Sequence, residues 1–375
     1  MPLITGIHSM LFAIGSTFFR GEKRNPNPFS AGKVRNNPAA PGNGAANTMM
    51  IAYTVVPRSA RMNVINIDLS GRGVRNAYHG PTPPLKFPAD RQSSKYNWIP
   101  MPIFSRYIGV DYSGAEAAEA SLKGLRVYMT EGDARPLEVA PPPSPRRYWT
   151  RKGIAEWLVE TLADDVPTLV GIDHGFSFPL RYFEVYALAP DWPAFLDDFQ
   201  RHWPTDGPHT YVDFVREGLV GNIEARWGSP HWRRLTEERA GRAKSVFQFD
   251  GPGSVAKATH AGVPWLRFMR QRLGTRLHFW PFDGWEIPAA RSTIAEVYPS
   301  LWSRGFARED RTLDQHDAYC IAMWLARADR DGSLAALLRP ELTPADSAVA
   351  RVEGWILGVP GRSGPGRRID SPTQH

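Results

Sequence analysis

The feature that most constrains this chain is a pair of short apolar runs that each end in an aspartate. Tyr107–Asp111 reads Tyr-Ile-Gly-Val-Asp, and Thr168–Asp173 reads Thr-Leu-Val-Gly-Ile-Asp. Continuous apolar runs of this length are typical of strands buried on both faces of a sheet. In open α/β sheets, functional groups collect at the carboxyl ends of such strands. We therefore expect Asp111 and Asp173 to lie at one edge of a shared sheet.

The segment between these two runs contains two further candidate strands and one helix. Leu125–Thr130 and the weaker Leu137–Val139 predict strands, and a proline-rich loop follows them. Thr150 is a suitable N-cap for a helix that runs to about Asp164, because the apolar residues lie on one face. The order strand, strand, strand, helix, strand is the opening of the RNase H-like fold. It predicts an α/β protein with a mixed sheet flanked by helices.

The chain is predicted to return to this sheet only after a long insertion. Residues 180–285 are rich in tryptophan and read as helical, so we expect a helical and aromatic insertion before the last core strand at Thr293–Val297. Helices follow at Asp314–Arg327 and in Pro344–Val359, which closes with a short strand or turn. Because tryptophan is more often core than contact, we expect most of these tryptophans to build a core for the insertion.

The RNase H-like domain is predicted to span residues 105–360, between two segments that lack periodic structure. Residues 1–100 contain 12 Lys and Arg and 3 Asp and Glu, a net of +9, which leaves −2 of the total +7 for the rest. Turn-rich composition over 1–104 predicts disorder. Two interpretations stay open there: a basic tail that contacts nucleic acid, or a mis-assigned start that precedes Met101. Residues 361–375 are predicted to be a disordered tail.

Neither a membrane anchor nor a disulfide framework is predicted. No run of about 20 apolar residues is present, so no membrane-spanning helix is expected. The apolar patch Met10–Phe19 lacks the features of a secretory signal. The single cysteine, Cys320, excludes an internal disulfide and is expected as a small core residue. These features favour a cytoplasmic location and no membrane partner, and they leave the oligomeric state open.

Four acidic residues occupy positions from which they could share a metal site. Asp111 and Asp173 end their strands, Glu296 lies within the strand Thr293–Val297, and Asp317 begins a helix whose other residues look buried. A buried acid needs a partner, and carboxylate oxygens suit Mg²⁺ or Mn²⁺. Two such ions could activate a water and stabilise the leaving oxygen of a phosphodiester. We therefore expect these four acids to be both the metal ligands and the catalytic groups.

Each acid also has a simpler interpretation. An aspartate after a strand is usually a turn or capping residue, and Asp314 is most simply the N-cap of its helix. His174 follows Asp173 directly, so it points to the other face of the sheet if the strand continues. Asp314, His174 and Glu353 are expected to support the metal ligands rather than to bind metal.

Five motifs occur in an order that resembles a known bacterial family. They are Ile-Gly-Val-Asp111-Tyr-Ser-Gly, Gly-Ile-Asp173-His-Gly-Phe-Ser-Phe-Pro, Ala-Glu296-Val-Tyr-Pro-Ser, Asp-Gln-His-Asp317-Ala-Tyr and Val-Glu353-Gly-Trp-Ile-Leu-Gly. Over residues 105–360 they resemble the family called domain of unknown function 429, which is regarded as predicted nucleases of RNase H fold. The resemblance implies the fold more firmly than the reaction. It covers neither the size of the insertion nor the first hundred residues.

Basic residues in the insertion are the candidate contacts with nucleic acid. Arginines interleaved with aromatic residues suit phosphate contact and base stacking. Glycines before a helix, as at 251–257, can present backbone N–H groups to a phosphate, although a plain turn explains them equally well. The candidate contacts are Arg233, Arg234, Lys257, Arg267 and Arg270.

The leading hypothesis is a metal-dependent nuclease, a hydrolase that cleaves phosphodiester bonds with Mg²⁺ or Mn²⁺. An ATP-using enzyme of the actin and sugar-kinase branch shares the opening topology, although such enzymes normally duplicate the fold and this domain is short for two copies. A non-catalytic RNase H-like scaffold would bind a partner through the insertion, although clustered carboxylates without a cation repel one another. The sequence leaves open whether the substrate is DNA, RNA or a hybrid.

Overall fold

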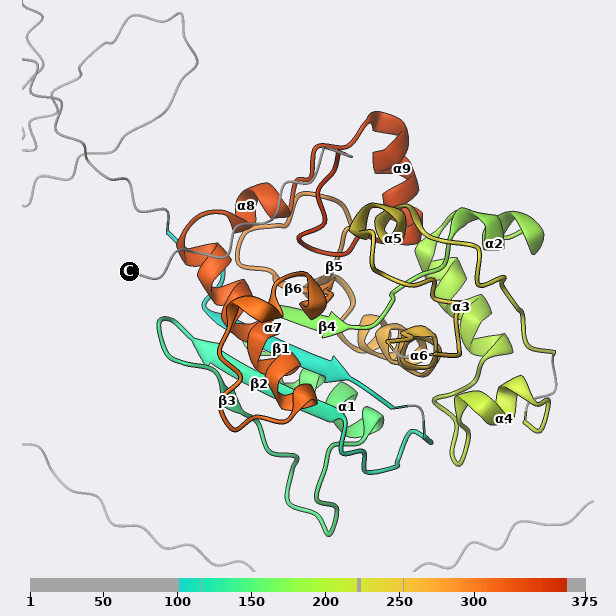
Figure 1. Ribbon diagram of the computed structural model, residues 1–375, viewed down its shortest axis with the longest axis horizontal. Helices are drawn as coiled ribbons and strands as arrows, with labels where there is room; N and C mark the ends of the chain where they lie inside the picture. The colour runs from blue at the N-terminus through green and yellow to red at the C-terminus, as the bar shows by residue number, and fades with distance from the viewer. Residues whose placement is uncertain (1–100, 115, 221–223, 252, 363–375) are drawn as a thin grey trace, which may run out of the picture. The chain divides into compact units, whose positions relative to one another are not determined.

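The computed structural model describes residues 101–114, 116–220, 224–251 and 253–362 (Figure 1). All of them belong to the unit Asp90–His375. The interpretations given above for residues 1–100 and 363–375 lie outside the described part of the chain.

A mixed six-stranded sheet flanked by helices organises the described residues into an α/β fold. The strand order is β3-β2-β1-β4-β6-β5. β1 pairs antiparallel with β2 and parallel with β4, and β2 pairs antiparallel with β3. β6 is parallel to both of its neighbours. The strands are β1 (Arg106–Tyr112), β2 (Leu125–Glu131), β3 (Leu137–Glu138), β4 (Thr168–Asp173), β5 (Leu277–Trp280) and β6 (Ser292–Glu296).

The helices range from one turn to five turns and cover both faces of this sheet. Within the described ranges, none is long and apolar enough to cross a bilayer. The α-helices are α1 (Arg151–Thr161), α2 (Leu180–Val185), α3 (Trp192–His202), α4 (Val212–Arg216), α5 (Leu235–Ala240), α6 (Ala256–Leu273), α7 (Leu313–Arg330), α8 (Leu334–Leu337) and α9 (Pro344–Glu353). Short 3-10 helices occur at η1 (Gly274–Arg276), η2 (Pro299–Leu301) and η3 (Ser303–Gly305).

Alternating side chains along β1 divide the core into two layers. Ile108 and Val110 belong to a cluster that includes apolar residues of α1, α3 and α6. Tyr107, on the other face, belongs to a cluster formed mainly by α7 and the chain after it. Figure 1 shows α7 lying across β1 and β2, the strands with which it makes its main sheet contacts. Side chains on the α7 face of the sheet and on the α1/α6 face are therefore separated by the sheet itself.

Several local predictions are confirmed, and two are wrong in detail. Thr150 caps α1 by accepting from the N–H of Gly153, and Cys320 is fully buried. The predicted insertion 180–285 is too long, because β5 lies inside it and forms the edge of the sheet beside β6. The predicted helix of Asp314–Arg327 begins earlier and ends later, as α7. The prediction that the segment after α9 closes with a short strand or turn is confirmed, because the described residues there contain a turn.

Most tryptophans of the insertion are core residues, as predicted. Trp203 and Trp280 are fully buried, and Trp192 and Trp265 are nearly so. Trp227 is the exception, at 39% exposed. The insertion therefore uses its aromatic residues to build a core, and few of them are free to stack on a ligand.

Candidate active site

Asp111 and Asp173 lie side by side at the carboxyl ends of two central strands. β1 and β4 are parallel, and their register pairs Asp111 directly with Asp173. Parallel neighbours in register present their side chains on the same face of the sheet. The prediction that the strands carrying these two residues are neighbours is confirmed.

Two glycines placed two residues before these aspartates bring α7 down onto the strands. Gly109 and Gly171 are also register partners. A Cβ at Gly109 would lie 2.2 Å from the carbonyl oxygen of Ala318, and a Cβ at Gly171 would lie 2.6 Å from Cγ2 of Ile321. A larger residue at either position would push the helix away. The first turns of α7, which carry Asp317, are thereby held over the face from which the two strand-end aspartates project.

The carboxyl group of Asp111 is buried among other acids. Burial raises the pKa of Asp111 to about 8. Ser113 opposes the shift, because its hydroxyl and its N–H donate to Oδ1 of Asp111 at 2.7 and 3.0 Å. The negative charges of Asp314 and Asp317 add to the shift. Asp111 therefore holds its proton near neutral pH unless a cation replaces it.

The pKa values of Asp173 and Asp317 are also raised. Burial raises the pKa of Asp173 well above its usual range, and the charges of Asp111, Asp317 and Glu296 raise it further. Burial, with a contribution from Asp314, raises the pKa of Asp317 to about 6. We call Asp111, Asp173 and Asp317 the acidic triad. Asp317 raises the pKa of both Asp111 and Asp173, and Asp111 raises that of Asp173, so the triad favours protons or a cation.

Asp314 is not the N-cap of its helix, so that prediction is wrong. Thr312 is the N-cap, and its hydroxyl accepts from the N–H of Gln315 at 3.3 Å while its own N–H donates to the Gln315 side chain at 3.0 Å. Asp314 lies in the first turn of α7. Burial raises the pKa of Asp314, against the lowering effect of Arg126 and Lys123. Asp314 therefore adds negative charge beside the acidic triad.

Glu296 has a different partner from the one we expected. Ile294, two residues earlier, packs in the cluster with α1 and α6, so alternation places Glu296 on the opposite face from the acidic triad. Arg234 donates to both of its oxygens, from Nη2 to Oε1 at 2.6 Å and from Nη1 to Oε2 at 2.7 Å. The N–H of Phe176 also donates to Oε2, at 3.1 Å. A metal ion at Glu296 would have to compete with this guanidinium.

Arg234 is 1% exposed, so its predicted role as a surface contact with nucleic acid is wrong. Its Nε donates to Oε1 of Glu237 at 2.8 Å, and its Nη1 donates to the carbonyl of Glu353 at 3.2 Å. The carboxylate of Glu353 accepts from the N–H groups of Leu180 at 2.7 Å and Leu235 at 2.6 Å, the first residues of α2 and α5. Glu353 therefore supports Arg234 and ties α9, α2 and α5 together.

His174 is a buried neutral residue and does not reach the acidic triad from the same face. Burial lowers the pKa of His174 to about 4. Its ring lies 4.6 Å from the ring of Tyr112, and its Nδ1 is 2.8 Å from the carbonyl oxygen of Gly175. A Cβ at Gly262 on α6 would lie 2.5 Å from its Nε2. His174 therefore packs between the sheet and α6. This is the face of the sheet opposite to Asp173, as predicted.

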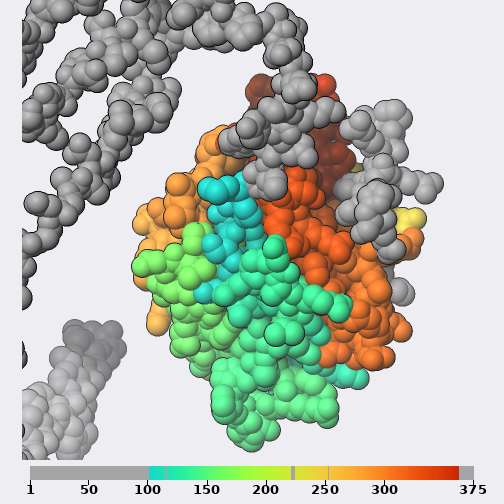
Figure 2. All heavy atoms as spheres, turned by 90° about the vertical axis from the view of Figure 1, so that its left-hand side faces the viewer, coloured from blue at the N-terminus to red at the C-terminus, as the bar shows by residue number. Residues whose placement is uncertain are grey.

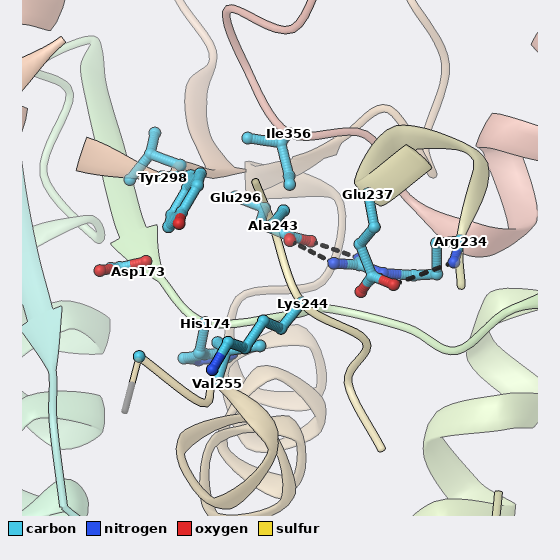
Figure 3. A pocket seen from close by; sticks show the side chains of 12 residues that line it. Asp173, His174, Arg234, Glu237, Ala243, Lys244, Val255, Glu296, Tyr298 and Ile356 are labelled. Carbon is cyan, nitrogen blue, oxygen red and sulfur yellow. Dashed lines mark hydrogen bonds and ion pairs between the residues drawn. The ribbon is translucent and has the colours of Figure 1, made fainter. Parts of the chain in front are cut away.

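A small cavity of about 30 Å³ lies where these two groups of charges meet (Figure 3). Asp173 lies on one side of it, and the ion pair of Arg234 with Glu296 lies on the other. Lys244 and His174 also line the cavity, and Figure 3 shows Lys244 extending toward His174. A space of this size holds about one water molecule or one small ion.

The remaining basic candidates are engaged within the fold. Lys257, Arg267 and Arg270 form ion pairs, and Arg233 donates to backbone carbonyls. The contacts are Arg233 to the carbonyl of Ala243 at 2.7 Å, Lys257 to Asp213 at 2.6 Å, Arg267 to Asp197 at 2.6 Å and Arg270 to Asp283 at 2.8 Å.

The donor chemistry of the acidic triad suits a hard divalent cation, but its spacing is not that of a bound ion. Within the described ranges, no group of three or more His, Cys, Asp or Glu side chains is arranged so that it could hold a metal ion. Carboxylate oxygens bind Mg²⁺ at about 2.1 Å. The side chains of the triad would therefore have to move toward one another around an ion.

Two features of this site were missing from our sequence analysis. The Gly-x-Asp pattern that ends both β1 and β4 is visible in the sequence, and it could have predicted the close approach of α7. The pairing of Arg234 with Glu296 had no local signal, because 62 residues separate the two.

Comparisons of the chain with protein-family models, with curated proteins and with solved structures found no match.

Proposed function

We propose that this protein is a metal-dependent nuclease of RNase H-like fold whose ligands are the acidic triad. The observation that carries the proposal is the register of Asp111 with Asp173, at the ends of parallel strands and beneath the turn of α7 that bears Asp317. An RNase H-like fold requires three antiparallel strands with a fourth strand parallel to the first. The order β3-β2-β1-β4, with β4 parallel to β1, fits that requirement. The family resemblance stays a prediction.

A cation would resolve the electrostatic conflict within the triad. Burial raises the pKa values of Asp111, Asp173 and Asp317, and the charge of Asp317 raises those of Asp111 and Asp173 further. When bound, Mg²⁺ or Mn²⁺ supplies stabilisation of negative charge on a phosphoryl oxygen. The chain itself contributes oriented oxygens: Ser113 fixes one oxygen of Asp111 by two hydrogen bonds. That bonding leaves the other oxygen of the carboxylate for a ligand.

Glu296 has a supporting role in this proposal. Its two oxygens accept from Arg234, and its charge raises the pKa of Asp173. We therefore place it beside the ion-binding group and not within it. This assignment differs from the four-ligand site that the sequence predicted.

Cleavage assays with matched variants test the proposal. Full-length protein with millimolar Mn²⁺ is expected to cleave a single-stranded, duplex or hybrid oligonucleotide. Changes around a metal site cost about 10- to 100-fold in activity, so loss of a ligand in Asp317→Asn is expected to cost at least about 100-fold. Glu156→Gln, at a side chain that is 51% exposed on α1, is the matched control and should cleave like the wild type.

Three results would contradict the proposal. One is the absence of Mn²⁺-dependent cleavage of every substrate. Another is equal cleavage by Asp317→Asn and wild type. The third is ATP turnover without cleavage, which would favour the kinase-like class instead. Circular dichroism of each variant should match the wild type, so that a loss of activity reports on the site.

A further inference from the structure

The segment that joins β3 to α1 carries positive charge that the rest of the domain lacks. Residues 139–150 include Arg146 and Arg147 and no Asp or Glu, whereas residues 101–375 together have a net charge of −2. The segment also contains four prolines, which restrict the backbone and present the following arginines at low entropic cost. Figure 1 shows it as a long loop that projects from the sheet, and in Figure 2 it forms the lower tip of the domain.

A groove of about 210 Å³ separates this segment from the edge of the sheet. Arg126 and Glu138 line it from the strands, and Arg147 and Tyr148 line it from the loop. The guanidinium carbons of Arg126 and Arg147 lie 4.9 and 5.3 Å from the centre of the Tyr148 ring. A tyrosine flanked by two arginines combines an aromatic face with donors that match a phosphate group.

The walls of this groove are anchored to the fold. The indole of the buried Trp149 donates to the carbonyl of Val139 at 2.9 Å. The hydroxyl of Ser121 donates to the carbonyl of Tyr148 at 2.9 Å and accepts from its N–H at 3.0 Å. These bonds close the two ends of the loop against each other, so the groove is already formed in the absence of a ligand.

One lining residue of the groove, Arg126, is paired with Asp111 of the acidic triad. Arg126 of β2 is the register partner of Asp111 on β1, and directly opposed residues of antiparallel strands project from the same face. The charge of Arg126 acts against the burial that raises the pKa of Asp314, so the guanidinium is within electrostatic reach of the first turn of α7. Glu138 shares Arg126 through an ion pair of 2.9 Å. Arg147, at the loop side, is the arginine best placed to meet a ligand first.

We propose that this groove binds the sugar–phosphate backbone of single-stranded nucleic acid and guides it to Asp111. The inference rests on the proposed nuclease function, because it assigns the path of that enzyme's substrate. The arginines contact the phosphates. The ring of Tyr148 packs against the guanidinium groups of the arginines and offers an aromatic surface to a base. The aromatic Tyr148 in the groove favours a single strand, whose bases are free to stack on it. Arg234 of the insertion cannot take this role, because it is buried.

Binding without catalysis tests the groove separately from the reaction. We would measure the fluorescence anisotropy of a labelled single-stranded oligonucleotide with full-length protein in EDTA, over a series of salt concentrations. The double variant Arg146→Gln/Arg147→Gln should bind at least about 10-fold more weakly at low salt. Each lost phosphate contact should reduce the slope of log K against log salt by about 0.7. Tyr148→Leu should weaken binding by about 5-fold or more through lost stacking.

A matched pair of arginines elsewhere provides the control. Arg181 on α2 and Arg339 after α8 are 61% and 64% exposed and lie away from the groove (Figure 1). Arg181→Gln/Arg339→Gln removes the same charge, and it should leave binding within about 2-fold of the wild type at about 0.15 M salt, where distant charges are screened. Three results would overturn the groove assignment. They are an equal loss of affinity in the two double variants, tighter binding of duplex than of single strand, and no binding of single strand at low salt.

The failure of the groove and the failure of the proposed reaction give different results. If Mn²⁺-dependent cleavage requires Asp317 but Arg146→Gln/Arg147→Gln binds like the wild type, the nuclease stands and the groove is wrong. If binding depends on Arg147 but no cleavage occurs with any metal, the groove stands and the proposed reaction is wrong.

Discussion

Two groups of carboxylates lie at the same end of the sheet, and the fold treats them in opposite ways. Glu237 and Glu296 share the buried guanidinium of Arg234, at 2.8 and 2.6 Å. In the acidic triad, burial raises the pKa of Asp173, and each of the three charges that act on it raises the pKa further. We call Arg234, Glu237, Glu296 and Glu353 the Arg234 group. This group contains its own cation, whereas the triad has a place for one to bind.

This contrast separates a structural use of buried charge from a ligand-binding use. Removing one partner of a closed buried ion pair leaves the other charge unpaired and destabilises the fold. Removing one charge from a set of like charges relieves repulsion. The two groups should therefore respond to similar substitutions with opposite changes in stability, which the following predictions use.

The largest expected effect is the loss of Arg234. Arg234→Met leaves Glu237 and Glu296 buried without their cation and should lower the free energy of unfolding by about 3–5 kcal/mol. Chemical denaturation measures this change. Arg339→Met, at an exposed ion pair with Glu286, is the control and should change it by less than about 1 kcal/mol. A loss below about 1 kcal/mol for Arg234→Met would mean that Glu237 and Glu296 do not depend on Arg234 for a counter-charge.

A smaller loss is expected at Glu353, which holds the start of two helices. Glu353→Gln should lower the free energy of unfolding by about 1–3 kcal/mol. The amide keeps one acceptor but turns a donor toward one of the N–H groups of Leu180 and Leu235. The control is Glu341→Gln, at a side chain that is 78% exposed. Equal stability of the two variants would remove Glu353 from the Arg234 group.

The opposite sign is expected in the acidic triad. Asp173→Asn should raise the free energy of unfolding in EDTA by about 1 kcal/mol, because the amide has no charge to desolvate or repel. Millimolar Mn²⁺ should raise the melting temperature of the wild type by mass action, and this rise should be absent in the variant. Asp133→Asn, at a side chain that is 88% exposed, should respond to Mn²⁺ like the wild type. A variant that is less stable than the wild type in EDTA would refute the repulsion.

The dependence of stability on pH gives the smallest and most specific signal. Burial raises the pKa of Asp111 to about 8 and that of Asp317 to about 6. A carboxyl group whose pKa is raised in the folded state stabilises that state while protonated, and the contribution is lost as pH rises through the folded pKa. In EDTA, the wild type should therefore lose a few °C of melting temperature relative to Asp111→Asn between about pH 5 and about pH 8.

Manganese should remove this pH dependence by replacing the protons of the triad. A difference between wild type and Asp111→Asn that stays constant over the whole range would show that the carboxyl groups are already ionised and compensated. Comparing the two proteins at each pH cancels the contribution of His174, since burial lowers its pKa in both.

Local sequence patterns were sufficient for the central part of the sheet. The apolar runs before Asp111 and Asp173 are strands because they are only five or six residues long and contain β-branched residues, which favours a strand over a helix. They are neighbours, as expected for the strands on either side of the intervening helix α1. Thr150 caps α1 because its side-chain oxygen can accept from the backbone two or three positions along the chain. These outcomes depend on residues close together in the sequence.

Patterns failed where the same composition suits two structures. Leu277–Trp280 is apolar and aromatic, which suits a buried helix as well as a strand, and only the open edge of β6 selected the strand. Asp314 looked like an N-cap until Thr312, two residues earlier, took that position with Gln315. Both errors arise because a short run does not reveal which neighbour will satisfy its hydrogen bonds.

The sequence by itself determined that Asp111 and Asp173 end adjacent strands, because alternation and apolar length act over a few residues. Only the tertiary structure decided the charge balance around them. It placed Arg234 against Glu296 across 62 residues, and it set α7 on Gly109 and Gly171 so that Asp317 faces the strand ends. The physical reason is that burial and pairing set the cost of a charge, and both depend on residues that the local pattern does not contain.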